Sequence, residues 1–175
     1  MSNIDIASYN RQGKLFYAAN VSVKTVSAVG TAMTGVILHN PAGSGKKLLV
    51  VDAGFSYVTV PVAVAAIGLG MAAPNATAPS SLTAIGTGVM AADGSGAGVA
   101  AAGRAYDAAT LAVAPTAAKW GFTYNYTSAA SGNPATVYFQ VDGSLLLVPG
   151  ATIALIALPT ASAGVGHISW VEVPA

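Results

Sequence analysis

Hydrophobic and polar residues alternate along two segments of the chain, 119–127 and 136–141. In the first segment, one face carries the aromatic residues Trp120, Phe122, Tyr124 and Tyr126. In the second segment, one face carries Val137, Phe139 and Val141. A period of two residues is typical of a β-strand with one face against a core. Both segments are therefore predicted to be strands with one face on the core and the other toward solvent or a partner.

Other segments are apolar without alternation, among them Gly35–Leu38, Leu48–Val51 and Ile153–Leu158. Short apolar runs that end at Gly or Pro indicate strands buried on both faces. Two longer apolar stretches, Val58–Ala73 and Leu145–Leu158, contain Pro and Gly and are shorter than the roughly 20 residues of a membrane-spanning helix. We expect both to be buried strands, and we expect no association with a membrane.

Turn residues separate these apolar runs. Asn40–Gly45 is predicted to join two strands, and Asp142-Gly143 predicts a hairpin between 137–141 and 145–148, because Gly adopts positive φ freely. Helix formers are scarce, and the glycines in Ala97–Ala114 disfavour a long helix in the one stretch that could hold one. The sequence thus predicts about eight to ten strands and an all-β sandwich or barrel.

The composition adds that little of the surface is charged. Charged residues make up 7% of the chain, hydrophobic residues 54%, and the net charge is +1. This excludes a polybasic surface for nucleic acid, which needs clustered Lys and Arg. Soluble monomers usually stay apart through charge, so we expect other subunits to cover much of this surface. The alternative is a monomer that tolerates low charge. There is no Cys, which excludes disulfides and thiolate metal sites.

Two regions differ from the rest. Residues 1–30 are predicted to form an extended N-terminal arm, followed by a sandwich domain over 31–175. The stretch 72–118 is predicted to form long Ala/Gly-rich loops with short strands. Within the arm, two basic residues and two aromatic residues are predicted to contact a partner, namely Arg11, Lys14, Phe16 and Tyr17. The alternative is a terminus that is disordered or packs on its own domain.

No motif for catalysis, a cofactor or a metal stands out. Gly43–Lys46 lacks the first Gly and the Ser or Thr of a phosphate loop, so we interpret it as a β-turn. His39 and His167 lack an evident third metal ligand. We therefore expect no enzyme, no cofactor and no metal. The aromatic residues predicted to lie in the core or a subunit interface are Trp120, Phe122, Tyr124, Tyr126 and Trp170. The alternative for the 120–126 stripe is a carbohydrate platform.

The last third of the chain resembles the closing strands of a known family. The segments concerned are Thr136–Gly143, Leu145–Gly150, Thr152–Leu158 and His167–Pro174, together with Ile37–Val50. They resemble the jelly-roll domains of tailed-phage capsid decoration (cement) proteins and related phage head or fibre proteins. The resemblance implies a jelly-roll-like antiparallel β-sandwich. It also implies a homotrimer on the capsid surface of the virion, at threefold or quasi-threefold positions, with the major capsid protein as partner.

Two other functions stay open at this point. One is a receptor-binding or glycan-binding head of a phage fibre or spike, which the aromatic stripe around Trp120 would serve. The other is a jelly-roll major coat subunit, although the N-terminal segment is not the strongly basic arm with which many such coats hold their genome.

Overall fold

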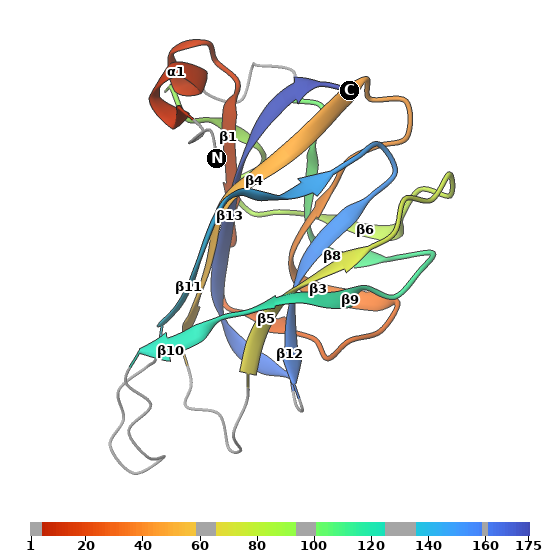
Figure 1. Cartoon of the computed structure of the whole chain (residues 1–175). Helices are drawn as coiled ribbons and strands as arrows, with labels where there is room; N and C mark the ends of the chain where they lie inside the picture. Colours follow the sequence, from red (N-terminus) through yellow and green to blue (C-terminus); the bar gives the residue numbers. More distant parts are fainter. Residues whose placement is uncertain (1–4, 59–65, 94–100, 125–135, 159–160) are drawn as a thin grey trace.

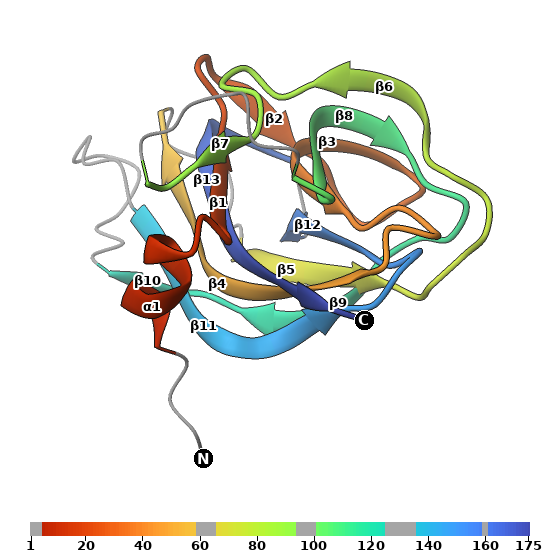
Figure 2. The same cartoon turned by 90° about the horizontal axis from the view of Figure 1, so that it is seen from above.

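Two antiparallel β-sheets pack face to face in the computed structural model, as Figure 1 and Figure 2 show. The structure describes residues 5–58, 66–93, 101–124, 136–158 and 161–175. Sheet A contains β1 (Leu15–Ala19), β2 (Lys24–Val26), β4 (Lys46–Tyr57), β7 (Met90–Ala91), β10 (Phe122–Tyr124), β11 (Thr136–Leu147) and β13 (Ser162–Pro174). Sheet B contains β3 (Ala32–His39), β5 (Ala66–Ala72), β6 (Ser80–Ala84), β8 (Arg104–Thr110), β9 (Thr116–Trp120) and β12 (Thr152–Leu158). The expected all-β sandwich is confirmed.

The strands pair in a nested order. β1 pairs with β13, β3 with β12, β4 with β11, and β5 with β9, always antiparallel. This order arises when one long antiparallel hairpin is rolled up, and it leaves β1-β13-β4-β11 in one sheet and β3-β12-β5-β9 in the other. Such a double-sheet, eight-stranded arrangement is a jelly roll. The predicted jelly-roll-like sandwich is therefore present. The chain between β5 and β9 contains three additional strands, β6, β7 and β8, which pair elsewhere in the two sheets.

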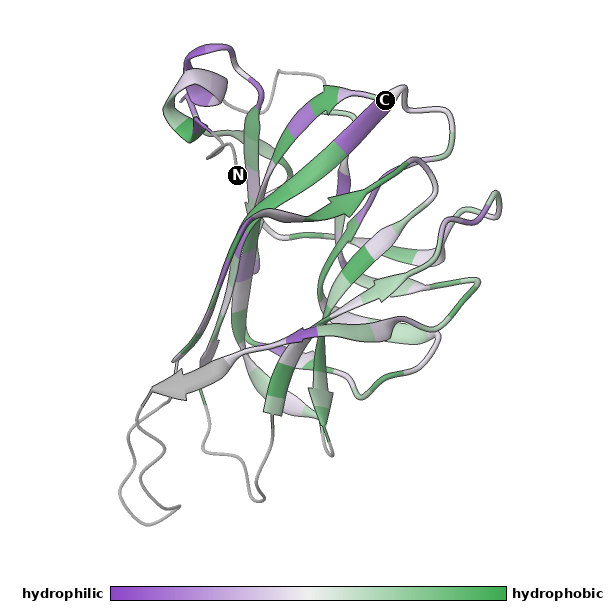
Figure 3. Ribbon diagram, in the orientation of Figure 1, coloured by the Kyte–Doolittle hydropathy of each residue, from purple (hydrophilic) through white to green (hydrophobic). Residues whose placement is uncertain are grey.

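The core lies between the two sheets. The alternation in 136–141 is confirmed, because Val137, Phe139 and Val141 are buried in the main apolar cluster with Trp170. β12 is buried on both faces, as predicted, from Thr152 to Ala157. Its outward side belongs to a second cluster on the outer face of sheet B, with Met33, Ile37, Ala72, Ala109, Leu111, Ala154 and Ile156. In Figure 3, hydrophilic colour is limited to short stretches, among them α1 and the loop after it.

The extended arm predicted for residues 1–30 is wrong for residues 15–26. β1 lies inside sheet A, between β13 and β7, and β2 pairs with β13. The physical reason is the alternation in β1, which turns Phe16 and Ala18 into the core. A six-residue helix that was not predicted, α1 (Ile6–Arg11), precedes β1. It begins where the Asp5 side chain accepts a hydrogen bond from the Ser8 N–H at 3.0 Å.

The hairpin predicted at Asp142-Gly143 is also wrong. β11 continues through both residues, and both of its halves pair with β4. The register moves from Gln140 opposite Asp52 to Leu145 opposite Val50, so β11 holds extra residues as a bulge. Asp142 and Gly143 have φ values of 48° and 73°, and their positive φ accommodates the bulge without reversing the chain. By contrast, the turn predicted at Asn40–Gly45 does join β3 to β4.

Candidate interaction surface

The outward side of sheet A, here called outer face A, carries aromatic and polar side chains on four adjacent strands. One row across the sheet contains Tyr17, Ser169, Asp52 and Gln140, from β1, β13, β4 and β11. The neighbouring row contains His167, Gly54 and Tyr138. These residues alternate with the core residues of the same strands, so each stands on a rigid strand and points away from the core.

An Asp–His pair lies at the centre of outer face A. His167 Nε2 is 3.4 Å from Asp52 Oδ1, and the two side chains are 46% and 25% exposed. Partial burial alone would raise the pKa of Asp52, but a hydrogen bond from His167 and the charge of His167 bring it below its ordinary value. The His167 ring needs Gly54 beneath it, because a Cβ there would lie 2.3 Å from its Cε1. Asp52 is therefore held ionised in a fixed position.

Tyr138 lies beside this pair and is 53% exposed. Its ring centroid is 6.5 Å from that of His167. Partial burial raises the pKa of the Tyr138 phenol, and the negative charges of Asp52 and Asp142 raise it further. Asp142 in turn accepts a hydrogen bond from the Gln140 side chain at 2.9 Å. An exposed aromatic ring with carboxylates beside it can bind a cation or a hydrogen-bond donor.

The structure separates the four residues that were predicted to contact a partner. Arg11 is exposed in the last turn of α1, and Lys14 donates a hydrogen bond to Gln12 Oε1 at 2.8 Å. Tyr17 is 40% exposed on outer face A. The prediction is wrong for Phe16, which is 3% exposed and stacks on Trp170 with ring centroids 6.0 Å apart, because the strand alternation turns it inward.

The aromatic residues predicted for the core or a subunit interface also differ from one another. Trp170 is fully buried, which confirms it as a core residue. The single strand predicted from residue 119 onward is wrong, because β9 of sheet B ends at Trp120 and β10 of sheet A begins at Phe122. Trp120 is 40% exposed and packs over Gly68 of β5. Phe122 and Tyr124 belong to β10, and Tyr126 lies outside the described residues.

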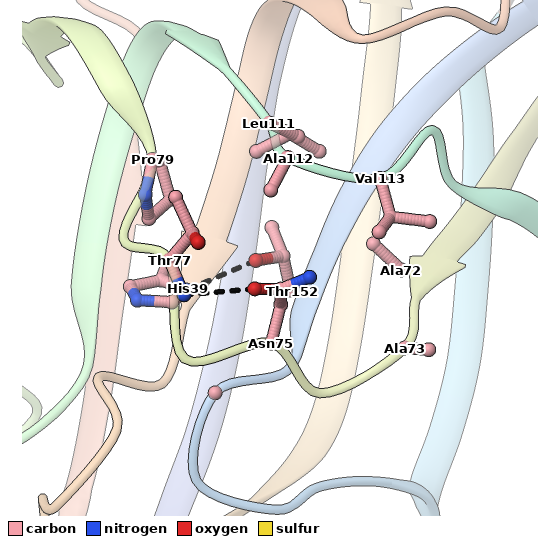
Figure 4. A pocket seen from close by; sticks show the side chains of 11 residues that line it. His39, Ala72, Ala73, Asn75, Thr77, Pro79, Leu111, Ala112, Val113 and Thr152 are labelled. Atoms are coloured by element: carbon pink, nitrogen blue, oxygen red, sulfur yellow. Dashed lines mark hydrogen bonds between the residues drawn. The ribbon is translucent and has the colours of Figure 1, made fainter.

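A shallow pocket of about 220 Å³ lies on the outer side of sheet B (Figure 4). It is lined by His39, Thr152 and Asn75 together with the 111–113 loop, and His39 Nδ1 is 2.9 Å from Thr152 Oγ1. Most of this volume is open to solvent, so the pocket encloses little more than a water molecule. His39 lies on sheet B and His167 on sheet A, and the described residues hold no group of three or more possible metal ligands.

His39 predicts a pH dependence of stability. Burial lowers its pKa below 6.5, although a hydrogen bond from the His39 ring to the Ala151 backbone opposes this. The unfolded chain therefore binds the proton more readily, and the free energy of unfolding should decrease as the pH falls from 6.5 through the folded pKa. Urea unfolding of the wild type and His39→Gln at several pH values measures this slope. The variant should lose it, and His167→Gln, on the exposed face, should keep it; an unchanged slope in His39→Gln contradicts the assignment.

The comparisons with known proteins add no relative. The chain matches no family, no curated protein and no solved structure with which it was compared. In the part of the chain that the structure describes, no helix has both the length and the hydropathy needed to cross a membrane.

Proposed function

We propose that this protein is a structural component of a phage virion, which binds the outer surface of an assembled capsid and stabilises it without catalysing a reaction. Its partner is the major capsid protein, and it acts as a homotrimer at threefold or quasi-threefold positions. The proposal extends the resemblance of the sequence to capsid decoration proteins.

The observation that carries the proposal is the place of the resembling segments in the fold. Thr136–Gly143, Thr152–Leu158 and His167–Pro174 fall on β11, β12 and β13, and Ile37–Val50 spans the turn from β3 to β4. These are strands of the nested jelly-roll pairing, so the resemblance follows the fold rather than an isolated loop. The low charge agrees with a surface that other subunits cover.

Stabilisation follows from mass action. A protein that binds the assembled shell and not separated coat subunits shifts the equilibrium toward the shell. A trimer that contacts the shell through three equivalent surfaces gains effective concentration after the first contact, so modest individual contacts give long residence.

The test uses undecorated shells and purified protein. We expect binding in co-sedimentation and a higher melting temperature of the shell by differential scanning calorimetry, which rises with protein concentration to saturation. Separated coat subunits are the control and should bind weakly or not at all. Absence of binding, or binding with no increase in shell melting temperature, overturns the proposal. Truncation of residues 1–17 is unsuitable, since it removes part of β1 from sheet A.

A further inference from the structure

Charged groups of opposite sign lie on and beside outer face A. α1, with the exposed Arg11 in its last turn, lies on the outer side of sheet A at the end where β1 begins (Figure 1 and Figure 2). Asp52 lies opposite Gln140, two residues along β11 from Tyr138, and Asp142 follows Gln140 in the same direction. Each copy of the chain therefore presents both a cation and an exposed aromatic ring with two carboxylates to one side of it.

Several of the other charged groups already have partners within the chain. Lys24 Nζ is 2.9 Å from Asp107 Oδ2, and Asp5 caps α1. Glu172 accepts hydrogen bonds from two backbone N–H groups and from Trp170 Nε1. Arg11 makes no ion pair with any described residue. Its charge is available to a partner.

Three of the four edge strands that the structure describes, β6, β7 and β10, offer poor surfaces for association. β7 has two residues and β10 has three, which is too short for another strand to pair with securely. β6 is exposed along its length, but its pairing with β8 shifts register twice and Ser81 has φ of 51°. Short and irregular edge strands oppose edge-to-edge pairing. Association between copies is better served by a face of the sandwich.

We propose that outer face A binds a second copy of the chain, with Arg11 of one copy over the edge of the Tyr138 ring that faces Asp52 and Asp142 of the other. This rests on the proposed function only in assuming that the protein works in several copies. A guanidinium stacks on an aromatic face and donates hydrogen bonds to carboxylates at the same time, which a lysine ammonium does less well. Exposed Tyr17 on the same face adds the aromatic area that subunit interfaces favour.

Two closed arrangements satisfy this contact. A pair related by a twofold axis makes it twice in one interface, whereas a ring of three makes it once in each interface. The trimer of the proposed function corresponds to the ring, and both arrangements depend on the same three side chains of the acceptor site.

The test reverses the charges of the contact by substitution and measures self-association by sedimentation velocity, without any shell present. Wild type should form dimers or trimers, and both Arg11→Glu and Asp52→Arg should weaken association by about 100-fold. The double variant Arg11→Glu/Asp52→Arg should regain much of it, because the attraction is restored with exchanged signs. Lys46→Glu, the same change of charge on a residue outside the contact, is the control and should associate like wild type. Circular dichroism and thermal melting check that each variant is folded.

A monomeric wild type overturns the proposal, as does association that Arg11→Glu leaves unchanged. A folded double variant that stays monomeric also overturns it. A monomeric wild type would also remove the trimer from the proposed function, whereas binding to the shell and its stabilisation are tested separately by shell melting. If wild type associates with itself as expected but does not stabilise shells, the proposed function alone is contradicted. If wild type stabilises shells but Arg11→Glu leaves its self-association unchanged, only the contact described here is contradicted.

Discussion

Replacing Glu172 by glutamine should lower the free energy of unfolding by about 3 kcal/mol. Glu172 is 6% exposed, and its carboxylate accepts hydrogen bonds from the N–H groups of Ala102 and Gly103 at 3.0 and 2.9 Å and from Trp170 Nε1 at 3.2 Å. Glutamine has nearly the same shape but replaces one accepting oxygen by an NH2 group, which faces buried donors. Buried donors without an acceptor are costly, and bonds to a charged acceptor are among the stronger ones.

Chemical denaturation monitored by tryptophan fluorescence measures this change, since Trp170 is itself one of the donors. Asp142→Asn provides the matched control on an exposed carboxylate and should change stability by no more than about 0.5 kcal/mol. A Glu172→Gln variant as stable as wild type would show that the carboxylate does not hold the loop before β8 against β13.

The second large effect is expected at Gly164, where alanine should destabilise the fold by about 3 kcal/mol. A Cβ at this position would lie 2.2 Å from the Ser56 carbonyl oxygen and 2.4 Å from Cζ of Phe55. The carbonyl belongs to β4, which pairs with β13 at this point, and Phe55 is 1% exposed against the edge of Tyr57. Neither group can move without disturbing sheet A, so the strain stays in the folded state.

Gly54→Ala is the control because its clash is as short but its neighbour is free to move. A Cβ there would lie 2.3 Å from the ring of His167, whose side chain is 46% exposed and can rotate outward. We expect a much smaller loss of stability, with the His167–Asp52 contact broken. If thermal melting shows the same loss of stability for Gly164→Ala and Gly54→Ala, the explanation is wrong, because it requires that only the clash inside the core cannot be relieved by movement of a neighbour.

The sequence predicted the burial of two segments correctly, although the strand predicted over 119–127 is divided between β9 of sheet B and β10 of sheet A. The alternation in 136–141 and the apolar run Ile153–Leu158 both gave the correct burial, because side-chain direction in a strand follows from period two alone. The same rule would have predicted a strand near the N-terminus. Leu15–Ala19 alternates as well, yet its basic neighbours led to the prediction of an arm, and Phe16 was assigned to a partner surface instead of the core.

The bulge in β11 marks a limit of local prediction. Asp-Gly between two apolar runs is a strong hairpin signal, and positive φ values do occur at both residues. Whether two such residues reverse the chain or form a bulge depends on the partner strand. Here β4 is long enough to pair with both halves of β11, so the chain continues in the same direction.

The candidate interaction surface was only partly visible in the sequence. Tyr138 alternates with the predicted core residues Val137 and Phe139, and Tyr17 was predicted to contact a partner. His167 was considered only as a metal ligand without an evident third partner, and no local pattern pointed to Asp52. They are far apart in the chain, and no local pattern relates them to Tyr138.

By itself the sequence determined the all-β class, the low charge and the inward and outward sides of its clearest strands, since these depend on composition and on short-range geometry. Only the tertiary structure decided which strands are neighbours. The pairing of β11, β4 and β13 placed Tyr138, Asp52 and His167 on one face, and the pairing of β1 with β13 drew the N-terminal segment into sheet A. Register between distant strands is set by the packing of the whole core, which no segment of the chain encodes alone.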